Sequence, residues 1–553
     1  MKKGEEFTGL VLRADFPNKG RVQTDQGIVT VKNAIPGQVI RGRIQKKKSG
    51  TYEGIWLETL KPAAAERPAL CPVFGQCGGC TYQLLPYSLQ LAQKTEQVRL
   101  LLTSVNAEAL LTEIVPSPSE LTYRNKMEYS FGNEYLDGEL TLGLHKRGSS
   151  YDITPAAECV LVPEDFNRIV RLTQDFFRQK GCSFYHIRRR TGFLRYLILR
   201  HGQATGELMV NLVTSSQYEP VSTASLLQEW QTELERLAPQ LDNRIVSVLH
   251  TLSDSPSDAV KPERVTLLFG REYYEEMLLG LHFKVSPFSF FQTNTGGAER
   301  LYQTVTEWLG PVSGKTIFDL YSGTGTITQI VSRVAKQAIG VEIVEEAVAA
   351  ARENAERNGL ANCRFIAGDV LKVIDDLTER PDILVLDPPR DGIHPKALPK
   401  IIGFGAEKII YISCKPTSLV RDLAIFQEHG YQAEKIKCVD MFPQTGHVET
   451  IMLLSKLDSK KYISVELPMD DMDLTSAESK ATYKQIQNYV LEKFGFKVST
   501  LYIAQVKRKW GLDVRENYNM SKNEKQKIPK CPIEKEEAIL NALKYYKIIK
   551  DDF

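Results

Sequence analysis

Cysteines are the first residues in this chain whose spacing suggests chemistry. Nine of them are spread unevenly over 553 residues. Three fall within ten residues in CPVFGQCGGC, and a fourth stands in PAAECVL: Cys71, Cys77, Cys80 and Cys159. Nine cysteines are too sparse for a disulfide scaffold of this length, and the N-terminus lacks the apolar run of a signal peptide. The cluster indicates metal binding or catalysis, and four thiolates suit either zinc or an iron–sulfur cluster.

A separate cysteine, Cys414, follows an apolar run in YISCKPTSL. Such a cysteine is usually a small buried hydrophobe, but Lys415 beside it could lower the pKa of the thiol. Glu449 in GHVET could be a general base or only the partner of a lysine. With a methyl donor, these two residues define one reaction. A thiolate adds to carbon 6 of uracil, carbon 5 attacks a sulfonium methyl group, and a base removes the carbon-5 proton.

Acidic residues recur where predicted strands end. Glu342 ends GVE and could accept ribose hydroxyls, Asp369 follows the next strand, and Asp387 opens DPPR. Before them, YSGTGT contains two glycines that allow a ligand close to the backbone, but the GxGxxG fingerprint is absent. The pattern favours S-adenosylmethionine over NAD. The alternative interpretation is that these acids only cap helices.

These side chains need an α/β scaffold to bring them together. Apolar runs alternate with helical patterns such as 345–360, which predicts a doubly wound, mostly parallel sheet over 291–457. Ligands of such sheets bind at the carboxyl ends of the strands, where the motifs fall. The predicted strands are 315–323, 336–344, 363–369, 381–389 and 408–416.

Residues 1–61 predict a different fold. About five short strands cut by turn signals suit an OB-like β-barrel, a fold that often binds oligonucleotides. Twelve Lys and Arg against six Asp and Glu leave this segment at +6, whereas the whole chain carries only +2. Its Lys46–Lys48 triplet indicates RNA contact or merely a solubilising turn.

The remaining segments are a central and a C-terminal one. Residues 62–290 carry the cysteine cluster and then strands alternating with short helices, as an α+β domain would. In them, 186–200 is basic and aromatic, which favours RNA contact or a basic strand packed on a core. Residues 458–553 begin with an acidic stretch, and two helices are predicted around FGFKVS, so we expect a mostly helical extension that resembles a helix-turn-helix.

Residues 1–457 resemble the S-adenosylmethionine-dependent RNA (uracil-5-)-methyltransferases, in particular the RumA-like 23S rRNA branch. The resemblance implies a TRAM barrel at 1–61, a class I methyltransferase domain at 291–457, Cys414 as the nucleophile and Glu449 as the general base. It implies a [4Fe–4S] cluster on Cys71, Cys77, Cys80 and Cys159. It also implies donor or substrate contacts from Gln292, Tyr321, Glu342, Asp369 and Asp387.

Three alternatives stay open. The same chemistry on tRNA is disfavoured because that branch usually lacks the barrel and the cysteines. A radical iron–sulfur enzyme would need C-x3-C-x2-C, whereas the spacing here is five and two. A nonenzymatic RNA-binding or regulatory protein would not need Cys414 and Glu449. We expect no membrane association, because no apolar run reaches the ~18 residues of a membrane span. We also expect 23S rRNA or a ribosomal precursor as the partner, no obligate protein partner, a monomer and a cytoplasmic location.

Overall fold

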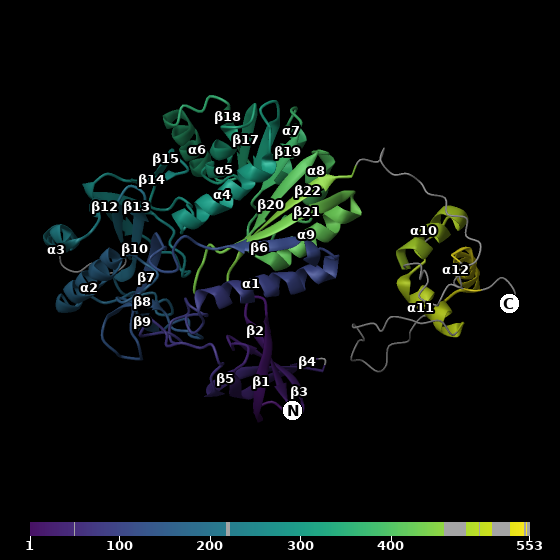
Figure 1. Ribbon diagram of the computed structural model, residues 1–553, viewed down its shortest axis with the longest axis horizontal. Helices are drawn as coiled ribbons and strands as arrows, with labels where there is room; N and C mark the ends of the chain where they lie inside the picture. The colour runs from purple at the N-terminus through teal and green to yellow at the C-terminus, as the bar shows by residue number, and fades with distance from the viewer. Residues whose placement is uncertain are drawn as a thin grey trace. The chain divides into compact units, whose positions relative to one another are not determined.

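The computed structural model describes residues 1–48, 50–216, 222–457, 483–496, 498–510, 531–546 and 549 (Figure 1). Two compact units divide the chain, a main unit of residues 1–459 and a C-terminal unit of residues 460–553. In the described ranges, no helix combines the length and apolar character that crossing a bilayer requires.

The N-terminal segment is a closed barrel, as predicted, with the strand order β1-β2-β3-β5-β4. Alternate apolar residues such as Val11, Val22 and Ile40 fill its interior, which is the period-two pattern of a strand with one buried face. The strands are β1 (Glu6–Asp15), β2 (Lys19–Thr24), β3 (Gly27–Lys32), β4 (Val39–Lys48) and β5 (Thr51–Lys61).

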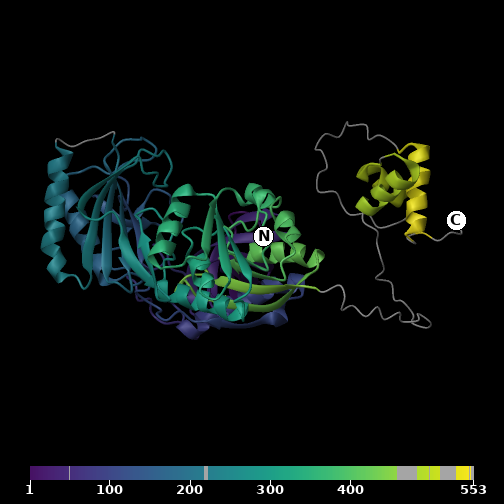
Figure 2. The same cartoon turned by 90° about the horizontal axis from the view of Figure 1, so that it is seen from above.

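A seven-stranded sheet follows, in the order β13-β12-β11-β10-β7-β8-β9. Helices α2 (Glu164–Gln179) and α3 (Thr223–Leu237) lie side by side along it, and their Phe166, Phe177 and Trp230 enter its core (Figures 1 and 2). The strands are β7 (Lys126–Gly132), β8 (Thr141–His145), β9 (Ile153–Pro155), β10 (Leu194–Gly202), β11 (Glu207–Thr214), β12 (Arg244–Leu252) and β13 (Arg264–Gly270).

The basic segment 186–200 divides into two parts. Arg195 and Arg200, both on β10, are buried, and they donate to the backbone oxygens of Ser253 and Ser289 at 2.6 Å each. These two arginines therefore tie the strand to neighbouring loops, and the alternative of a basic strand packed on a core is correct for them. The three arginines at 188–190 are exposed.

The predicted α/β segment forms an eight-stranded sheet in the order β18-β17-β16-β19-β20-β22-β21-β6. Five parallel strands match the predicted ones, and β22 runs antiparallel between β20 and β21, which is the arrangement of the class I methyltransferase fold. The strands are β16 (Thr316–Leu320), β17 (Gln337–Glu342), β18 (Cys363–Ala367), β19 (Ile383–Leu386), β20 (Lys408–Ser413), β21 (Tyr431–Val439) and β22 (Glu449–Lys456).

Helices cover both faces of this sheet, and each face has its own apolar core. One core includes α1 (Tyr87–Leu102), α7 (Val370–Asp376), α8 (Leu398–Gly403) and α9 (Pro416–Glu428). The other includes α4 (Thr295–Leu309), α5 (Thr326–Ser332) and the hairpin of β14 (Tyr274–Leu278) and β15 (Leu281–Val285), while α6 (Glu345–Arg357) packs on β18. Short 3₁₀ turns lie at Thr103–Val105, Glu108–Leu110 and Ala238–Gln240.

One strand of the sheet comes from outside the predicted 291–457 segment. Strand β6 (Leu111–Val115) adds to β21 in parallel, so the 62–290 segment supplies both α1 and an edge strand to the methyltransferase sheet. Sequence periodicity reports local structure and carries no information about which sheet a strand joins.

The C-terminal unit contains three described helices around a small apolar core that includes Ile486, Ile503 and Ile539. Helices α10 (Tyr483–Phe494) and α11 (Thr500–Lys509) lie where two helices are predicted around FGFKVS. Helix α12 (Ile533–Tyr545) is not among the predicted ones, although its apolar residues recur at helical spacing. The predicted acidic stretch at 469–480 lies outside the described residues.

A buried ion pair joins α1 to the turn that precedes β22. Lys94 Nζ lies 2.7 Å from Asp440 Oδ1, both side chains are fully buried, and Nζ also donates to the Phe442 oxygen at 2.9 Å. Beside this pair, Gln90 and Gln444 exchange hydrogen bonds of 2.8 and 2.9 Å. Residues 440–444 are thus fixed to α1 by buried polar groups that bond to one another.

Replacing Lys94 with methionine should lower the free energy of unfolding of the chain by about 3–5 kcal/mol, because Asp440 would stay buried without a counter-charge. The matched control is Arg99→Met on the same helix, whose ion pair with Glu96 is exposed and should cost under about 1 kcal/mol. Urea unfolding followed by tryptophan fluorescence measures both losses. Equal losses in the two variants would contradict a structural role for the buried pair.

Candidate active site

A cavity of about 1730 Å³ opens at the carboxyl ends of the parallel strands. Its lining brings together six of the predicted site residues from segments far apart in the sequence: Gln292, Tyr321, Glu342, Asp387, Cys414 and Glu449. Asp369 is not part of this lining. Its carboxylate accepts from the Leu371 amide at 2.9 Å and so caps α7, as in the alternative interpretation of the strand-end acids.

The predicted nucleophile and base stand opposite each other on adjacent strands. Ser413 pairs with Thr450 in the antiparallel register of β20 and β22, and the next positions in that register are Cys414 and Glu449. Cys414 directly follows β20, while Glu449 is the first residue of β22. The antiparallel strand β22 therefore places the Glu449 carboxylate beside Cys414, at the carboxyl end of β20.

Three carboxyl groups, of which Asp319 and Glu449 are buried and Asp387 is half-buried, make this site electrostatically unusual. Burial, and then the neighbouring Asp387, raise the pKa of Glu449 to about 8. Burial and Asp319 raise the pKa of Asp387 to about 7, and burial raises that of Asp319 to about 7 although Thr328 donates to its carboxylate at 2.6 Å. Because neighbouring negative charges in a low dielectric repel one another, the site retains protons near neutral pH.

The thiol of Cys414 is held in its protonated form. Burial, and then the charges of Glu449 and Asp387, raise its pKa to about 11, while Arg390 is the cation that acts to lower it. Lys415 instead lies 3.7 Å from Asp391 and is exposed. The cation seen to lower the thiol pKa is Arg390, which follows Asp387 in the same DPPR motif, and the effect of Lys415 stays a prediction.

The glycine-containing turn after β16 is shaped by strain and by backbone hydrogen bonds. Tyr321 adopts a φ of 71°, a conformation that is rare for a side chain this large, and its amide donates to the Val341 oxygen at 3.0 Å. The Glu342 carboxylate accepts from the Gly323 and Val344 amides at 3.0 Å each. These bonds fix Glu342 at the cavity wall, with lone pairs left for a ligand.

Gln292 lies between the central sheet and α4, at the wall of the same cavity. Its backbone oxygen accepts from the Asn125 amide at 3.0 Å, and its side chain forms a hydrogen bond with buried Tyr302. An amide held in this way can present a fixed donor or acceptor to a ligand.

The four clustered cysteines line a second cavity, of about 480 Å³. Burial and, to a smaller extent, the neighbouring thiols raise the pKa of Cys80 to about 12 and that of Cys159 to about 11. All four are free thiols, and the Gly79 amide donates to Cys77 Sγ at 3.3 Å. As placed in the described residues, no three His, Cys, Asp or Glu side chains converge tightly enough for a metal ion.

The two cavities share a wall. Five residues line both of them: Gly78, Gly79, Arg124, Thr293 and Thr445. Thr445 belongs to the turn that α1 anchors, and the amides of Thr81 and Tyr82 donate to the Gln444 oxygen at 2.8 and 2.9 Å. The cysteine segment and the turn before Glu449 are therefore one connected structure, which no spacing in the sequence indicates.

Comparison with known proteins agrees with this geometry. Residues 221–457 match the family described as tRNA (uracil-5-)-methyltransferase. An uncharacterized RNA methyltransferase of Clostridium tetani is 45% identical over 83% of this chain and 99% of its own. An uncharacterized RNA methyltransferase of Caldanaerobacter subterraneus is 46% identical over 82% of this chain and 100% of its own. The chain belongs to the RNA (uracil-5-)-methyltransferase family.

A solved structure extends the likeness beyond the methyltransferase domain. The Pyrococcus abyssi tRNA (uracil-54, C5)-methyltransferase, in complex with S-adenosyl-L-homocysteine, is 26% identical with a TM-score of 0.63. The match covers 81% of this chain and all of that one. Within the RNA (uracil-5-)-methyltransferase family, the domain organisation seen here therefore does not by itself distinguish an rRNA enzyme from a tRNA enzyme.

In the wild-type chain, Cys414 should react slowly with iodoacetamide near about pH 8, because a thiol with a pKa of about 11 is almost wholly protonated there. Glu449→Gln removes a carboxylate that raises this pKa, so alkylation at about pH 9 should become several-fold faster. The control is Glu353→Gln, which alters another carboxylate of the same cavity. Mass spectrometry of the Cys414 peptide gives the rates, and an unchanged rate in Glu449→Gln would contradict the electrostatic account.

Proposed function

We propose that this chain transfers a methyl group from S-adenosylmethionine to carbon 5 of uridine in 23S rRNA, through a covalent adduct between Cys414 and carbon 6. The observation that carries the proposal is the register of β20 and β22, which sets a cysteine opposite a buried carboxylate in one cavity. Uracil carbon 5 is a poor nucleophile until a thiolate adds at carbon 6.

The residues of this site have distinct parts in the reaction. Cys414 enters as a thiolate, with Arg390 as the cation that favours the charged form. The donor supplies an electrophilic methyl group on a sulfonium. Glu449, with a pKa of about 8, then takes the carbon-5 proton, and the thiolate leaves carbon 6 as the ring regains its double bond. Because the base must be ionised, its titration should raise the rate with pH up to about 8, and ionisation of the Cys414 thiol should add a further rise above that pH.

The methyl donor fits the strand-end groups. Glu342, with its carboxylate oriented by two backbone amides, suits the two ribose hydroxyls, and Tyr321 and Gln292 stand on the same cavity wall. The Pyrococcus abyssi enzyme was solved with S-adenosyl-L-homocysteine bound, which supports this class of ligand. We retain contacts of Asp387 with the substrate or donor, and of Asp369 with adenine, as proposals.

The choice of 23S rRNA rests on the resemblance of the motifs to the rRNA branch. The barrel and the cysteine cluster no longer add weight to it, because a tRNA enzyme matches four-fifths of this chain. Methylation of tRNA is therefore the second candidate. A nonenzymatic role would leave the opposed Cys414 and Glu449 without a purpose.

Cells lacking the protein should lose 5-methyluridine from 23S rRNA, since the proposed reaction is its source. The wild-type gene should restore it, the Cys414→Ala variant should not, and the control Cys363→Ala should, because Cys363 lies on β18 outside the active-site lining. Mapping of 5-methyluridine in total rRNA and tRNA measures this. Loss confined to tRNA would replace the rRNA assignment, and no loss in either RNA would contradict the function.

We further propose that Cys71, Cys77, Cys80 and Cys159 hold a [4Fe–4S] cluster. Four free thiols around a common cavity are the donor set that such clusters use, and about 480 Å³ is far more than a single ion needs. An amide donating to a cysteine sulfur, as Gly79 does, is a usual feature of cluster loops. Carbon-5 methylation by this route needs no electron transfer, so the proposed role is structural.

Cys80→Ser should yield a protein without iron, a lower thermal unfolding temperature and weaker RNA binding. The physical reason is that residues 76–80 are bonded to 145–147, through Gly78 to the His145 oxygen and Arg147 to the Gln76 oxygen, so the cluster would brace the central sheet. Cys182→Ser, outside the cavity, is the control. Iron content, unfolding temperature and RNA affinity are measured. A variant without iron that keeps normal stability and affinity would contradict the structural role.

The remaining assignments follow from these proposals. The barrel at 1–61 and the central segment 62–290 would contact RNA, residues 291–457 would carry out the chemistry, and the role of 458–553 stays open. We propose a cytoplasmic monomer that needs no obligate protein partner.

A further inference from the structure

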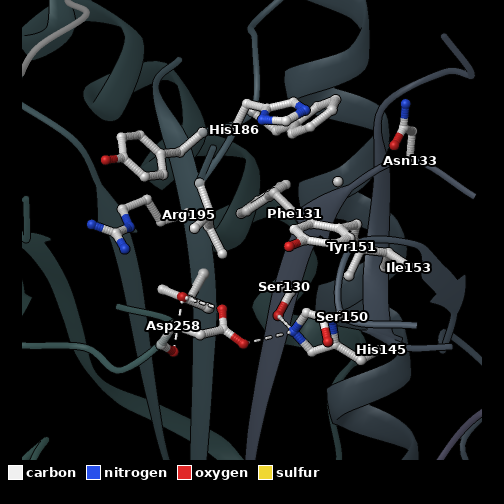
Figure 3. A pocket seen from close by; sticks show the side chains of 15 residues that line it. Ser130, Phe131, Asn133, His145, Ser150, Tyr151, Ile153, His186, Arg195 and Asp258 are labelled. Carbon is white, nitrogen blue, oxygen red and sulfur yellow. Dashed lines mark hydrogen bonds and ion pairs between the residues drawn. The ribbon is translucent and has the colours of Figure 1, made fainter. Parts of the chain in front are cut away.

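A small pocket in the central sheet lies apart from the active site (Figure 3). It is formed by β7, β8, β10 and the loops around 150, 186 and 258, and it shares no lining residue with the active-site cavity. Its volume is about 70 Å³. A water needs about 10–15 Å³ of such space, so about five waters fit, which is the scale of one planar ring.

Aromatic rings form much of the pocket wall, together with Arg195, and Arg188 lies behind the ring of Tyr151. The Arg195 guanidinium stacks 4.3 Å from the centre of the Tyr185 ring, and that of Arg188 lies 4.1 Å from the centre of the Tyr151 ring. Figure 3 shows Tyr151, Phe131 and His186 around the open space. Proteins bind unstacked RNA bases on rings and guanidinium planes of this kind.

Polar groups gather at one end of the pocket. Asp258 accepts from Tyr196 at 2.8 Å and lies 3.1 Å from His145 Nε2 (Figure 3). The hydrogen bond with His145 lowers the pKa of Asp258, so this carboxylate is ionised. A carboxylate has about four lone-pair sites, and these two contacts leave acceptor capacity for another donor.

The rim of the pocket is positively charged. Arg188, Arg189 and Arg190 are exposed next to it, and in the part of the chain that the structure describes none of them has a carboxylate at ion-pair distance. Unpaired arginines at a surface attract phosphates. An aromatic pocket with an ionised acceptor and a basic rim matches a nucleotide of a single-stranded RNA segment more closely than it matches an apolar ligand.

We propose that this pocket binds an unstacked nucleobase of the substrate RNA, at a nucleotide other than the methylated uridine, with an exocyclic amino group of that base directed to Asp258. The inference rests on the proposed function, because it takes RNA as the substrate. His145 lines both this pocket and the cavity of the four clustered cysteines, so the two cavities lie next to each other.

The test uses the full chain and the RNA in which 5-methyluridine is mapped, transcribed without modification. Asp258→Asn removes the charge but keeps the shape, and Tyr151→Ala removes an exposed ring of the pocket. The matched controls are Asp175→Asn on α2 and Tyr135→Ala, both exposed and outside the lining. We expect each pocket variant to lower RNA affinity about 5- to 20-fold and each control to leave it within about two-fold.

A second readout identifies the base. Ultraviolet crosslinking of the wild-type complex, followed by mass spectrometry, should find a nucleotide attached to peptides containing Tyr151 or Tyr185, with the mass of adenosine, cytidine or guanosine monophosphate. A uridine adduct would overturn the assignment of an amino-bearing base. Wild-type methylation together with unchanged affinity in both pocket variants would overturn the pocket while leaving the proposed function intact. Absence of RNA binding and methylation in the wild type would overturn both.

Discussion

The buried ion pair between Lys94 and Asp440 is the constraint on which the arrangement of this molecule depends. Its two charged groups have no access to water, and each has its counter-charge in the other, 2.7 Å away, with further hydrogen bonds to the backbone of Phe442. The pair joins residues 346 positions apart in the sequence and so fixes α1 against the turn before β22. If α1 moved away from this turn, one of the two charges would stay buried without its partner. One position of α1 relative to the turn is therefore strongly preferred.

The turn held by this ion pair also contacts the barrel and the cysteine segment, and it leads to Glu449. The turn that begins at Asp440 carries Gln444, which binds the backbone of Thr81 and Tyr82, and it ends at Glu449. Gly446 in the same turn approaches the Pro17 oxygen of the barrel so closely that a Cβ atom would collide with it. The barrel, the cysteine segment and Glu449, the proposed general base, are thus positioned by one turn. RNA bound to the first two would be held in a fixed relation to the third.

Desolvation then determines the chemistry of the site. Parallel strands and one reversed strand bring together buried Asp319 and Glu449 and half-buried Asp387 and Cys414. The resulting pKa values of Asp319, Asp387, Glu449 and Cys414, about 7, 7, 8 and 11, all lie above the ordinary ones. The free enzyme therefore stores protons and keeps its thiol unreactive.

Much of this could be predicted from the sequence, because periodicity and residue type are local properties. The five parallel strands and the five-stranded barrel were identifiable in that way, and residue type selected Cys414 and Glu449, which the structure places at one cavity. The partner of Lys94, the placement of β6 and the influence of Arg390 on the thiol were not, since each depends on which distant segments meet. Asp369 shows the ambiguity of such a position, because an acid at a strand end is equally suited to capping the helix that follows.

The central claim is that Cys414 forms a covalent bond to the substrate pyrimidine. Substrate RNA carrying 5-fluorouridine tests it most directly, because fluorine at carbon 5 leaves no proton for Glu449 to remove and the adduct cannot collapse. With S-adenosylmethionine present, we predict a protein–RNA complex that survives denaturation, with the nucleotide on the peptide containing Cys414. No such complex with RNA that the enzyme methylates, or an adduct on any other residue, would contradict the account.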